Sequence, residues 1–339
     1  MKLSILIKAL NEEAMIAKCL EAALAEALKV DGEVILVDSL STDRTIEIAR
    51  RYPVRIIQFS WRMDCGAGSA VQLGYQYAHG KYLYVLDGDM VLQPGFLSAA
   101  LNYLESNPDV AGVAGKVLDT SIKTLDDKRR ASMATAQQQI LEVPDLGGGG
   151  LYRRKAIESV GYLAHRWLPA CEEAELGARL RASGWHLIRL PNIAVLHTGY
   201  SESNFQMLHR LWRNRRMHAY GIYLRTAFGR SWWWLSIRQA WFVFVAPALH
   251  VVAGMLAAIC AMYIEVIKIV PALAITESLI WFGVITLMAV RKRSVSDAVL
   301  SAYGWHFYAL AAALGFMHST PDPMIPINAR ELTEHQIPL

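Results

Sequence analysis

Apolar residues follow two patterns along the chain, and the first covers roughly residues 1–115. Short apolar runs, which predict strands, alternate there with segments in which apolar residues recur every three or four positions, which predict helices. The expected strands are residues 3–9, 33–38, 54–59 and 81–87, and the expected helices are 16–28, 43–51, 70–80 and 95–106. Asn11 is expected to cap the first helix, and Ser41 or Thr42 the second. This alternation predicts an α/β fold with a mostly parallel sheet and helices on both faces.

From residue 240 onward the apolar residues form three long segments, 240–264, 269–290 and 298–317. The first carries no formal charge apart from the titratable His250, the second carries only Glu277, and the third carries none. Because roughly 20 apolar residues in a helix cross a bilayer core, we predict three transmembrane helices. Buried helices of a large soluble core are the less favoured alternative, since such helices rarely run so long without a polar face.

A basic, tryptophan-rich segment precedes these helices. It contains Trp212, Trp232, Trp233 and Trp234 together with Arg210, Arg213, Arg215, Arg216, Arg225, Arg230 and Arg238. We expect it to lie on anionic lipid headgroups. Nucleic-acid binding could use the same residues, but the neighbouring spans already explain a basic flank, so no nucleic-acid partner is expected. The predicted regions are an α/β domain (1–200), a basic interfacial segment (201–239), three membrane helices (240–318) and a tail (319–339).

The positions of the basic residues also predict an orientation. The cluster before the first span and the run 291–293 between the second and third put both on the cytoplasmic side, with the tail after Met317 on the far side. The first residues contain no export signal, because their apolar stretch is too short. The four cysteines form no metal-binding or C-x-x-C spacing, which suits a reducing compartment. We therefore expect a multi-pass protein of the plasma (inner) membrane with a cytoplasmic N-terminal domain.

Asp87-Gly88-Asp89 follows the fourth predicted strand. An Asp-Gly pair after β-formers can make a hairpin, but the residues after Pro94 have helical periodicity and offer no partner strand. In parallel sheets ligands bind beyond the carboxyl ends of the strands, where Asn11, Glu12 and Asp38 also lie. The turn after the first strand reads KALNEE and lacks the G-x-G-x-x-G of a dinucleotide fold, which argues against a Rossmann oxidoreductase.

Five motifs then occur in a familiar order. They are SILIKALNEE, ILVDSLSTDRT, GAGSAVQLGYQYAHGKYLYVLDGDMVLQPGFL, GGGGLYRRKAIESVGYL and EEAELGARLRASGW. Over roughly residues 1–200 the chain resembles the family 2 glycosyltransferases, inverting enzymes with a Rossmann-like GT-A fold that use nucleotide-diphosphate sugars. The resemblance implies a GT-A catalytic domain followed by an all-α transmembrane region.

The resemblance also implies which residues bind the donor. Asp89 would be the chief ligand of a divalent cation and Asp87 would contact the metal or the ribose. Hard oxygen ligands favour Mg²⁺ or Mn²⁺. His197 falls where some relatives supply a third metal ligand, although a lone histidine after a strand is as often structural. The implied donor-binding residues are Ala9, Asn11, Glu12, Asp38, Asp64 and Asp87.

The same resemblance implies a general base at Glu173, where the family usually has aspartate. An alternative is that Glu172, Glu173 and Glu175 are simply the acidic first turn of a helix ending near Ser183, and both can hold at once. The implied acceptor-binding residues are Gly148, Gly149 and Glu172. A glycine run can also be a flexible linker, but this short one is more typical of close backbone approach to a ligand.

Some positions depart from the family. The usual Pro-Thr-Tyr is Lys8-Ala9-Leu10, and Val71 and Gln72 replace basic and amide residues, so the donor is not identified; Arg62 and Lys8 are alternative phosphate contacts. We expect a membrane-anchored glycosyltransferase whose partners are a nucleotide sugar, a lipid or glycan acceptor, and membrane lipids. The alternatives are a non-catalytic scaffold, or a processive synthase, which FQMLHRLWRN disfavours because it lacks the spacing of Q-x-x-R-W.

Overall fold

The computed structural model describes residues 1–198, 203–263 and 268–332, and these form two units. The first contains the described residues of 1–207, 227–236 and 320–339, and the second those of 208–226 and 237–319. The predicted boundary at residue 200 lies outside the described residues. Each unit is described by itself below.

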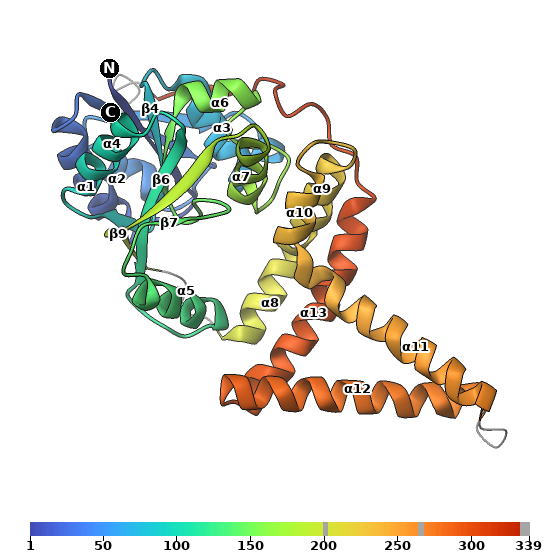
Figure 1. The fold of residues 1–339 in the computed structure, drawn as a ribbon. Helices are drawn as coiled ribbons and strands as arrows, with labels where there is room; N and C mark the ends of the chain where they lie inside the picture. Colours follow the sequence, from blue (N-terminus) through green and yellow to red (C-terminus); the bar gives the residue numbers. More distant parts are fainter. Residues whose placement is uncertain (199–202, 264–267, 333–339) are drawn as a thin grey trace. The chain divides into compact units, whose positions relative to one another are not determined.

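A single mixed sheet forms the centre of the first unit (Figure 1). Its strands are β1 (Leu3–Ala9), β2 (Gly32–Asp38), β3 (Arg55–Phe59), β4 (Tyr82–Asp87), β5 (Met90–Leu92), β6 (Val110–Asp119), β7 (Leu141–Glu142), β8 (Gly150–Arg153), β9 (His186–His197) and β10 (Ala329–Glu331). The order is β10-β3-β2-β1-β4-β8-β6-β9-β5, with β7 paired to β9. The predicted strands β3, β2, β1 and β4 are parallel neighbours, which confirms the expected fold.

Helices cover both faces of the sheet, as predicted (Figure 1). One face packs against α1 (Ile16–Leu28), α2 (Thr45–Ala49) and α4 (Phe96–Ser106), and the other against α3 (Ala67–Tyr77), α6 (Arg154–Val160) and α7 (Glu172–Ala182). The first unit also contains η1 (Arg62–Asp64) and α5 (Leu125–Ala136). Strand β1 is apolar on both faces because helices cover both. Leu3, Ile5 and Ile7 are buried on one face, and Leu6 is buried on the other.

The predicted helix caps are wrong. Helix α1 begins at Ile16, and Asn11 lies in the preceding loop with φ 58°, where its Oδ1 accepts a hydrogen bond from the Thr42 backbone N–H at 2.8 Å. Ser41 in turn accepts from the Asn11 N–H at 2.9 Å. The capping side chains are therefore used to join the β1–α1 and β2–α2 loops to each other, and α2 begins only at Thr45.

The Asp87-Gly88-Asp89 turn does not form a hairpin. A three-residue strand, β5, does follow it, but β5 pairs antiparallel with β9 and not with β4. In that pairing Met90 lies opposite His197, and the Thr198 N–H donates to the Asp89 carbonyl at 3.1 Å. The pairing thus sets His197 beside Asp89.

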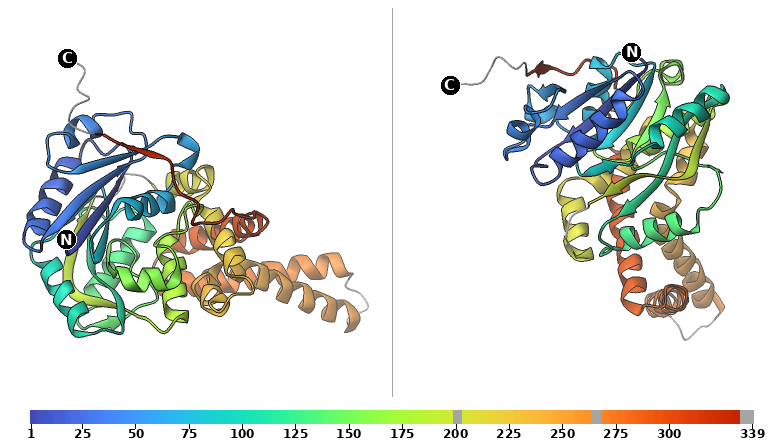
Figure 2. Two further views of the ribbon diagram at one scale, coloured as in Figure 1. Left: turned by 90° about the horizontal axis from the view of Figure 1, so that it is seen from above. Right: turned by 90° about the vertical axis from the view of Figure 1, so that its left-hand side faces the viewer.

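The C-terminal segment joins the first unit, and both views in Figure 2 show it beside the N-terminal strands. Strand β10 pairs antiparallel with β3, and Arg55 forms a two-point ion pair with Glu331 at 2.8 and 3.2 Å. This corrects the predicted position of the tail on the far side of the membrane, because a strand hydrogen-bonded to β3 must lie on the same side as β3. The predicted tail's last residues, 333–339, lie outside the described part.

The second unit is helical. Its main helices are α9 (Ala219–Ala227), α11 (Val245–Tyr263), α12 (Ile269–Lys292) and α13 (Val295–Phe316), with η2 (Arg216–His218) and η3 (Trp241–Phe244); α8 (Asn204–Arg213) and α10 (Trp233–Gln239) cross the unit boundaries. Three helices, 241–263, 269–292 and 295–316, are long and apolar enough to span a membrane. The predicted apolar segments are therefore helical over their described residues.

Candidate active site

The carboxyl ends of β1 and β4 bring the first group of charged residues together. Lys8 lies opposite Asp87 across the two strands, and its Nζ is 3.2 Å from Asp87 Oδ1. The turn that follows β4 is held to β1 because the Gly88 N–H donates to the Lys8 carbonyl at 2.9 Å. A Cβ on Gly88 would lie 3.1 Å from Glu12 Cγ and 3.3 Å from Ala9 Cβ. Glycine at this position therefore lets the β1–α1 loop, with Glu12, pack directly on the turn.

Negative charge is concentrated around Glu12. Burial, followed by the charges of Asp89, Asp87 and Asp43, raises the pKa of Glu12 to about 7. The effect of Asp89 and Asp87 on this pKa shows that the three carboxyl groups are close enough to repel one another. Such a cluster favours a bound cation.

Asp89 and His197 form the second part of the site. His197 Nε2 lies 3.3 Å from Asp89 Oδ2, and its Nδ1 lies 2.6 Å from Asp119 Oδ1. Arg130 pairs with the other side of Asp119, with Nε 2.9 Å from Oδ2. Burial opposes a charge on His197, but its hydrogen bonds to Asp89 and Asp119 prevail and raise its pKa to about 9.

Two observations bear on whether this donor set suits a divalent cation. Asp89 Oδ1 is buried and has no hydrogen-bond partner in the described part of the chain. Asp119 holds the Nδ1 side of His197 and directs Nε2 toward Asp89, as a carboxylate behind a metal-binding histidine does. No cluster of three or more His, Cys, Asp and Glu side chains among the described residues has the spacing to enclose a metal by itself. Asp89 and His197, with Asp87 paired to Lys8 beside them, therefore supply only part of a coordination shell, which the bound donor or water would have to complete.

The N-terminus of α7 supplies the third part of the site. Glu172 is buried and its Oε1 lies 2.9 Å from Lys8 Nζ, so Lys8 joins the β4 carboxylate to the start of α7. Burial tends to lower the pKa of Lys8, but Asp87, Glu172 and Glu173 outweigh it and raise that pKa. The predicted acidic first turn of this helix is confirmed, and it begins after Cys171, which has φ 66°.

Glu173 differs from both neighbouring glutamates. Glu175 is fully buried in a two-point ion pair with Arg179, both distances being 2.8 Å, and accepts a hydrogen bond from Tyr162. Glu173 keeps partial exposure and forms no salt bridge to any described residue. Burial, followed by the Glu172 carboxylate, raises the pKa of Glu173 to about 8. Of the three, Glu173 alone combines access with the raised pKa of a base suited to neutral pH.

The predicted nucleoside-binding residues lie along the ends of β1, β2 and β3. Asp38 is fully buried, and its oxygens accept from the Ser41 N–H at 3.2 and 3.3 Å and from Gln58 Nε2 at 2.8 Å. Ala9 ends β1 directly opposite Asp38. Asp64 pairs with the buried Arg166 at 2.7 Å. Asp38 and Asp64 thus shape this edge through protein contacts of their own.

The predicted acceptor loop precedes β8. Gly148 and Gly149 have φ of 79° and 102°, which favours glycine. A Cβ on Gly149 would lie 3.3 Å from the Tyr84 hydroxyl oxygen and from the Val85 carbonyl oxygen. The loop is therefore packed closely against β4 and is not a flexible linker.

Two parts of the site were not predicted from the sequence. Asp119 was missed because the predicted alternation of strands and helices stops near residue 115, although the run KVLD ends in a carboxylate as β2 and β4 do. Lys8 was expected only as a phosphate contact. The residue pattern along β1 does not indicate that Lys8 pairs with Glu172 of α7, which lies 164 residues later in the sequence.

Part of the chain is similar to known glycosyltransferases. A sequence profile described as glycosyl transferase family 2 matches residues 4–161. The chain is 33% identical over 131 residues to the low-salt glycan biosynthesis hexosyltransferase of Haloferax volcanii, covering 37% of this chain and 31% of that protein. It is 32% identical over 115 residues to the undecaprenyl-phosphate 4-deoxy-4-formamido-L-arabinose transferase of Pectobacterium atrosepticum, covering 32% and 35%. It is 30% identical over 116 residues to the dolichol-phosphate mannosyltransferase of Pyrococcus furiosus, covering 33% and 32%. The matches span about a third of each relative's length.

Solved structures give the fold. The mannosyltransferase PcManGT from Pyrobaculum calidifontis, in complex with GDP-Man and Mn²⁺, superposes with a TM-score of 0.62 at 19% identity, covering 93% of this chain and 87% of that chain. Residues 1–349 of S. aureus TarS in complex with UDP-GlcNAc give 0.51 at 13% identity, covering 100% and 98%. Residues 4–161 therefore match the glycosyl transferase family 2 profile, and they lie within a GT-A-like sheet domain that is followed by apolar helices.

Proposed function

We propose that this protein is a membrane-attached inverting glycosyltransferase that moves a sugar from a nucleotide-diphosphate donor to a lipid, lipid-linked glycan or membrane-associated polysaccharide. The observation that carries the proposal is the arrangement around Lys8. It joins Asp87, at the end of β4, to Glu172, which is next to Glu173 at the start of α7. Lys8 therefore lies between Asp87, which could help to hold the leaving diphosphate, and the start of α7, where Glu173 could activate an acceptor.

On the donor side, Asp89, Asp87 and His197 would hold Mg²⁺ or Mn²⁺. When bound, that ion supplies positive charge for the diphosphate leaving group. Asp119 keeps the His197 ring in one orientation, and Gly88 leaves room for Glu12 beside the turn. Ala9, Asn11, Glu12, Asp38 and Asp64 are the proposed nucleoside and donor contacts.

On the acceptor side, Glu173 would take the proton of the attacking hydroxyl. A pKa of about 8 makes its carboxylate a stronger base than an ordinary glutamate. Glu172 and Lys8 hold the first turn of α7 in place through their ion pair. Gly148 and Gly149 are the proposed backbone surface against which the acceptor lies.

The proposed acceptor and location rest on the apolar helices and on the relatives. The names of two relatives specify a lipid phosphate, undecaprenyl-phosphate and dolichol-phosphate. A site attached to the bilayer raises the effective concentration of such acceptors. The proposed location is the plasma (inner) membrane, with the first unit in the cytoplasm.

Hydrolysis of nucleotide sugars by the purified full-length protein tests the proposal. With Mn²⁺ present, the wild type should hydrolyse at least one of the common UDP-, GDP- or dTDP-sugars slowly, and Asp89→Asn should lose this activity and the Mn²⁺-dependent thermal shift with nucleotide. Asp109→Asn, at an exposed residue, is the matched control. No hydrolysis by the wild type, together with equal nucleotide binding by Asp89→Asn, would instead indicate a non-catalytic scaffold.

A further inference from the structure

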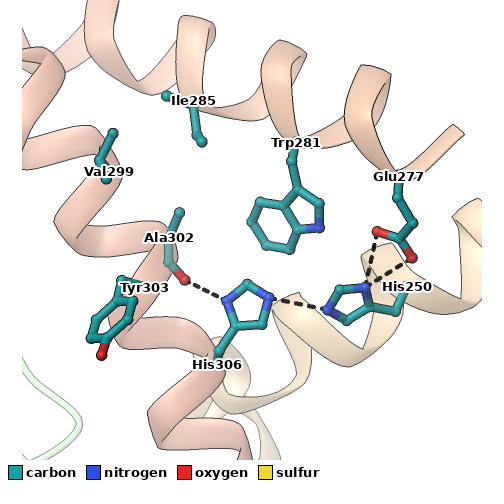
Figure 3. Close-up of a pocket in the computed structure, with 8 residues that line it drawn as sticks. All are labelled: His250, Glu277, Trp281, Ile285, Val299, Ala302, Tyr303 and His306. Carbon is teal, nitrogen blue, oxygen red and sulfur yellow. Dashed lines mark hydrogen bonds and ion pairs between the residues drawn. The ribbon is translucent and has the colours of Figure 1, made fainter. Parts of the chain in front are cut away.

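A polar cluster lies within the apolar helices of the second unit (Figure 3). His250 comes from α11, Glu277 and Trp281 from α12, and His306 from α13. They line an open pocket of about 390 Å³ together with Ile285, Val299, Ala302 and Tyr303. Ionisable side chains are rare in membrane helices and commonly mark a functional site when they occur. The proposed glycosyl transfer uses none of them.

The partners of the two imidazoles determine where their hydrogens are. His306 Nδ1 lies 2.8 Å from the Ala302 carbonyl oxygen, which can only accept, so Nδ1 carries the hydrogen. His250 Nδ1 lies 2.9 and 3.0 Å from the two oxygens of Glu277, so it also acts as a donor. A neutral imidazole that donates from Nδ1 is an acceptor at Nε2.

The two Nε2 atoms nevertheless face each other at 3.0 Å. Two lone pairs at this distance repel unless a cation lies between them. Because a zinc–imidazole bond is about 2.0–2.1 Å long, two imidazole nitrogens on one tetrahedral ion are about 3.3 Å apart, and the 3.0 Å separation is close to this distance. The separation in the structure therefore suits a shared metal ion.

The groups behind the histidines support the same interpretation. A metal-binding histidine almost always donates its other ring N–H to a carboxylate, a backbone carbonyl or water. Here Glu277 provides a carboxylate for one ring and Ala302 a carbonyl for the other (Figure 3). The Trp281 ring covers the pair, with its centroid 4.6 Å from that of His306 and 5.6 Å from that of His250.

We propose that His250 and His306 bind a nitrogen-preferring transition-metal ion, of which Zn²⁺ is the representative, through their Nε2 atoms. No described third His, Cys, Asp or Glu completes the coordination, so water or a solute in the pocket takes the other positions. The ion links α11 to α13, and Glu277 connects α12 to the same site. Binding therefore stabilises the three-helix arrangement.

Metal titration of the full-length protein tests this. The protein is purified in detergent with a histidine-free affinity tag and carries Asp89→Asn to weaken the separate carboxylate site. Co²⁺ followed by visible absorption, and Zn²⁺ measured by elemental analysis after dialysis, should each show one tightly bound equivalent. Zn²⁺ should also raise the thermal midpoint.

Variants assign the binding to the cluster. His250→Gln and His306→Gln should each lose the bound equivalent, and Glu277→Gln should bind roughly 10–100-fold more weakly because the ligand loses its orienting carboxylate. His318→Gln, at an exposed histidine of the same unit, should bind normally. Circular dichroism checks that each variant is folded.

A further test keeps both histidines and so does not depend on whether a histidine variant folds. Electron paramagnetic resonance of Cu²⁺ bound to this protein should show two coordinated imidazoles. Two results would overturn the proposal. One is the absence of any bound equivalent at 100 µM Zn²⁺, roughly the concentration at which micromolar sites are saturated, which would mean that the imidazoles share only a proton. The other is unchanged binding in His306→Gln.

Discussion

The Lys8 ammonium group connects the two carboxylate groups of the proposed reaction. It pairs with Asp87 at 3.2 Å and with Glu172 at 2.9 Å, and its charge also lowers the pKa of Glu173 against the opposing effects of burial and Glu172. Removal of the Lys8 charge should therefore change the pKa of Glu173, the proposed base, although no direct ion pair joins the two residues.

The pH dependence of transfer should follow Glu173. With a pKa of about 8, the carboxylate is the minority form below pH 8, so kcat/KM should fall about tenfold for each pH unit below that value and level off above it. Glu173→Gln should lower kcat roughly 10²- to 10⁴-fold and keep donor binding. It should also abolish the fall of kcat/KM at low pH, which is the acidic limb of the pH profile. Glu158→Gln, at an exposed glutamate, is the control. An unchanged profile in Glu173→Gln would show that another group is the base.

Lys8→Met should move the acidic limb of the kcat/KM profile to higher pH. Removing the ammonium group takes away the attraction that lowers the pKa of Glu173, while burial and Glu172 continue to raise it. The thermal midpoint should also fall, because buried Glu172 loses its ion pair. Lys18→Met, at an exposed position of α1, should change neither quantity. A limb that stays in place would mean that Lys8 does not influence the base.

At the level of elements, two glycines allow close backbone contacts between helices of the second unit. A Cβ on Gly315 of α13 would lie 2.1 Å from the His218 carbonyl oxygen, and one on Gly221 of α9 would lie 1.9 Å from that of Ala312. Both neighbours are backbone atoms and cannot move aside without separating the helices. A Cβ on Gly304, in the same helix as Gly315, would meet no described atom of another element within 4 Å.

Gly315→Ala should therefore destabilise the protein and Gly304→Ala should not. Both substitutions remove a helix-destabilising glycine, which favours the helix by about 1 kcal/mol, but only Gly315→Ala introduces a backbone clash, with a cost of about 1–3 kcal/mol for overpacking. The two variants share one helix, so comparison of their thermal midpoints in detergent isolates the clash. Equal midpoints would mean that η2 and α13 do not pack as described.

The elements also show which features a sequence can predict. Apolar runs predicted β1 to β4 correctly. These strands are buried on both faces, so most of their residues are apolar and the run is visible in the sequence. The caps failed because Asn11 and Ser41 make contacts between loops instead of within helices. Strand β10 was missed because Ala-Arg-Glu has no apolar pattern and becomes a strand only by pairing with β3. The Asp89–His197 contact depends on the β5–β9 pairing, which local patterns do not reveal, and was anticipated only through family resemblance.

At the level of the whole molecule, the β3–β10 pairing limits the membrane topology. Residues on both sides of the apolar helices belong to one sheet, so we predict that an even number of those helices crosses the bilayer. The basic run 291–293 favours α11 and α12 as the crossing pair. In this predicted topology both ends of α13 lie on the cytoplasmic side of the bilayer. Its C-terminal half packs along the basic segment, with Phe307 against Trp212 at 5.5 Å and Tyr308 against Tyr220 at 5.9 Å.

Disulfide trapping in native membranes tests this topology. Gln58 and Arg330 are direct partners in the antiparallel β3–β10 pair, where Cα atoms are about 4.5–5.5 Å apart, a separation that a disulfide can bridge. Gln58→Cys/Arg330→Cys should therefore cross-link with a mild oxidant. Gln58→Cys/Lys268→Cys should not, because Lys268 precedes α12 and the predicted topology puts it on the far side of the bilayer. A topology reporter should be cytoplasmic when fused after Arg293 or Leu339 and non-cytoplasmic after Lys268. A non-cytoplasmic reporter after Leu339, with no cross-link between positions 58 and 330, would restore three crossings and exclude the β3–β10 pairing in the membrane.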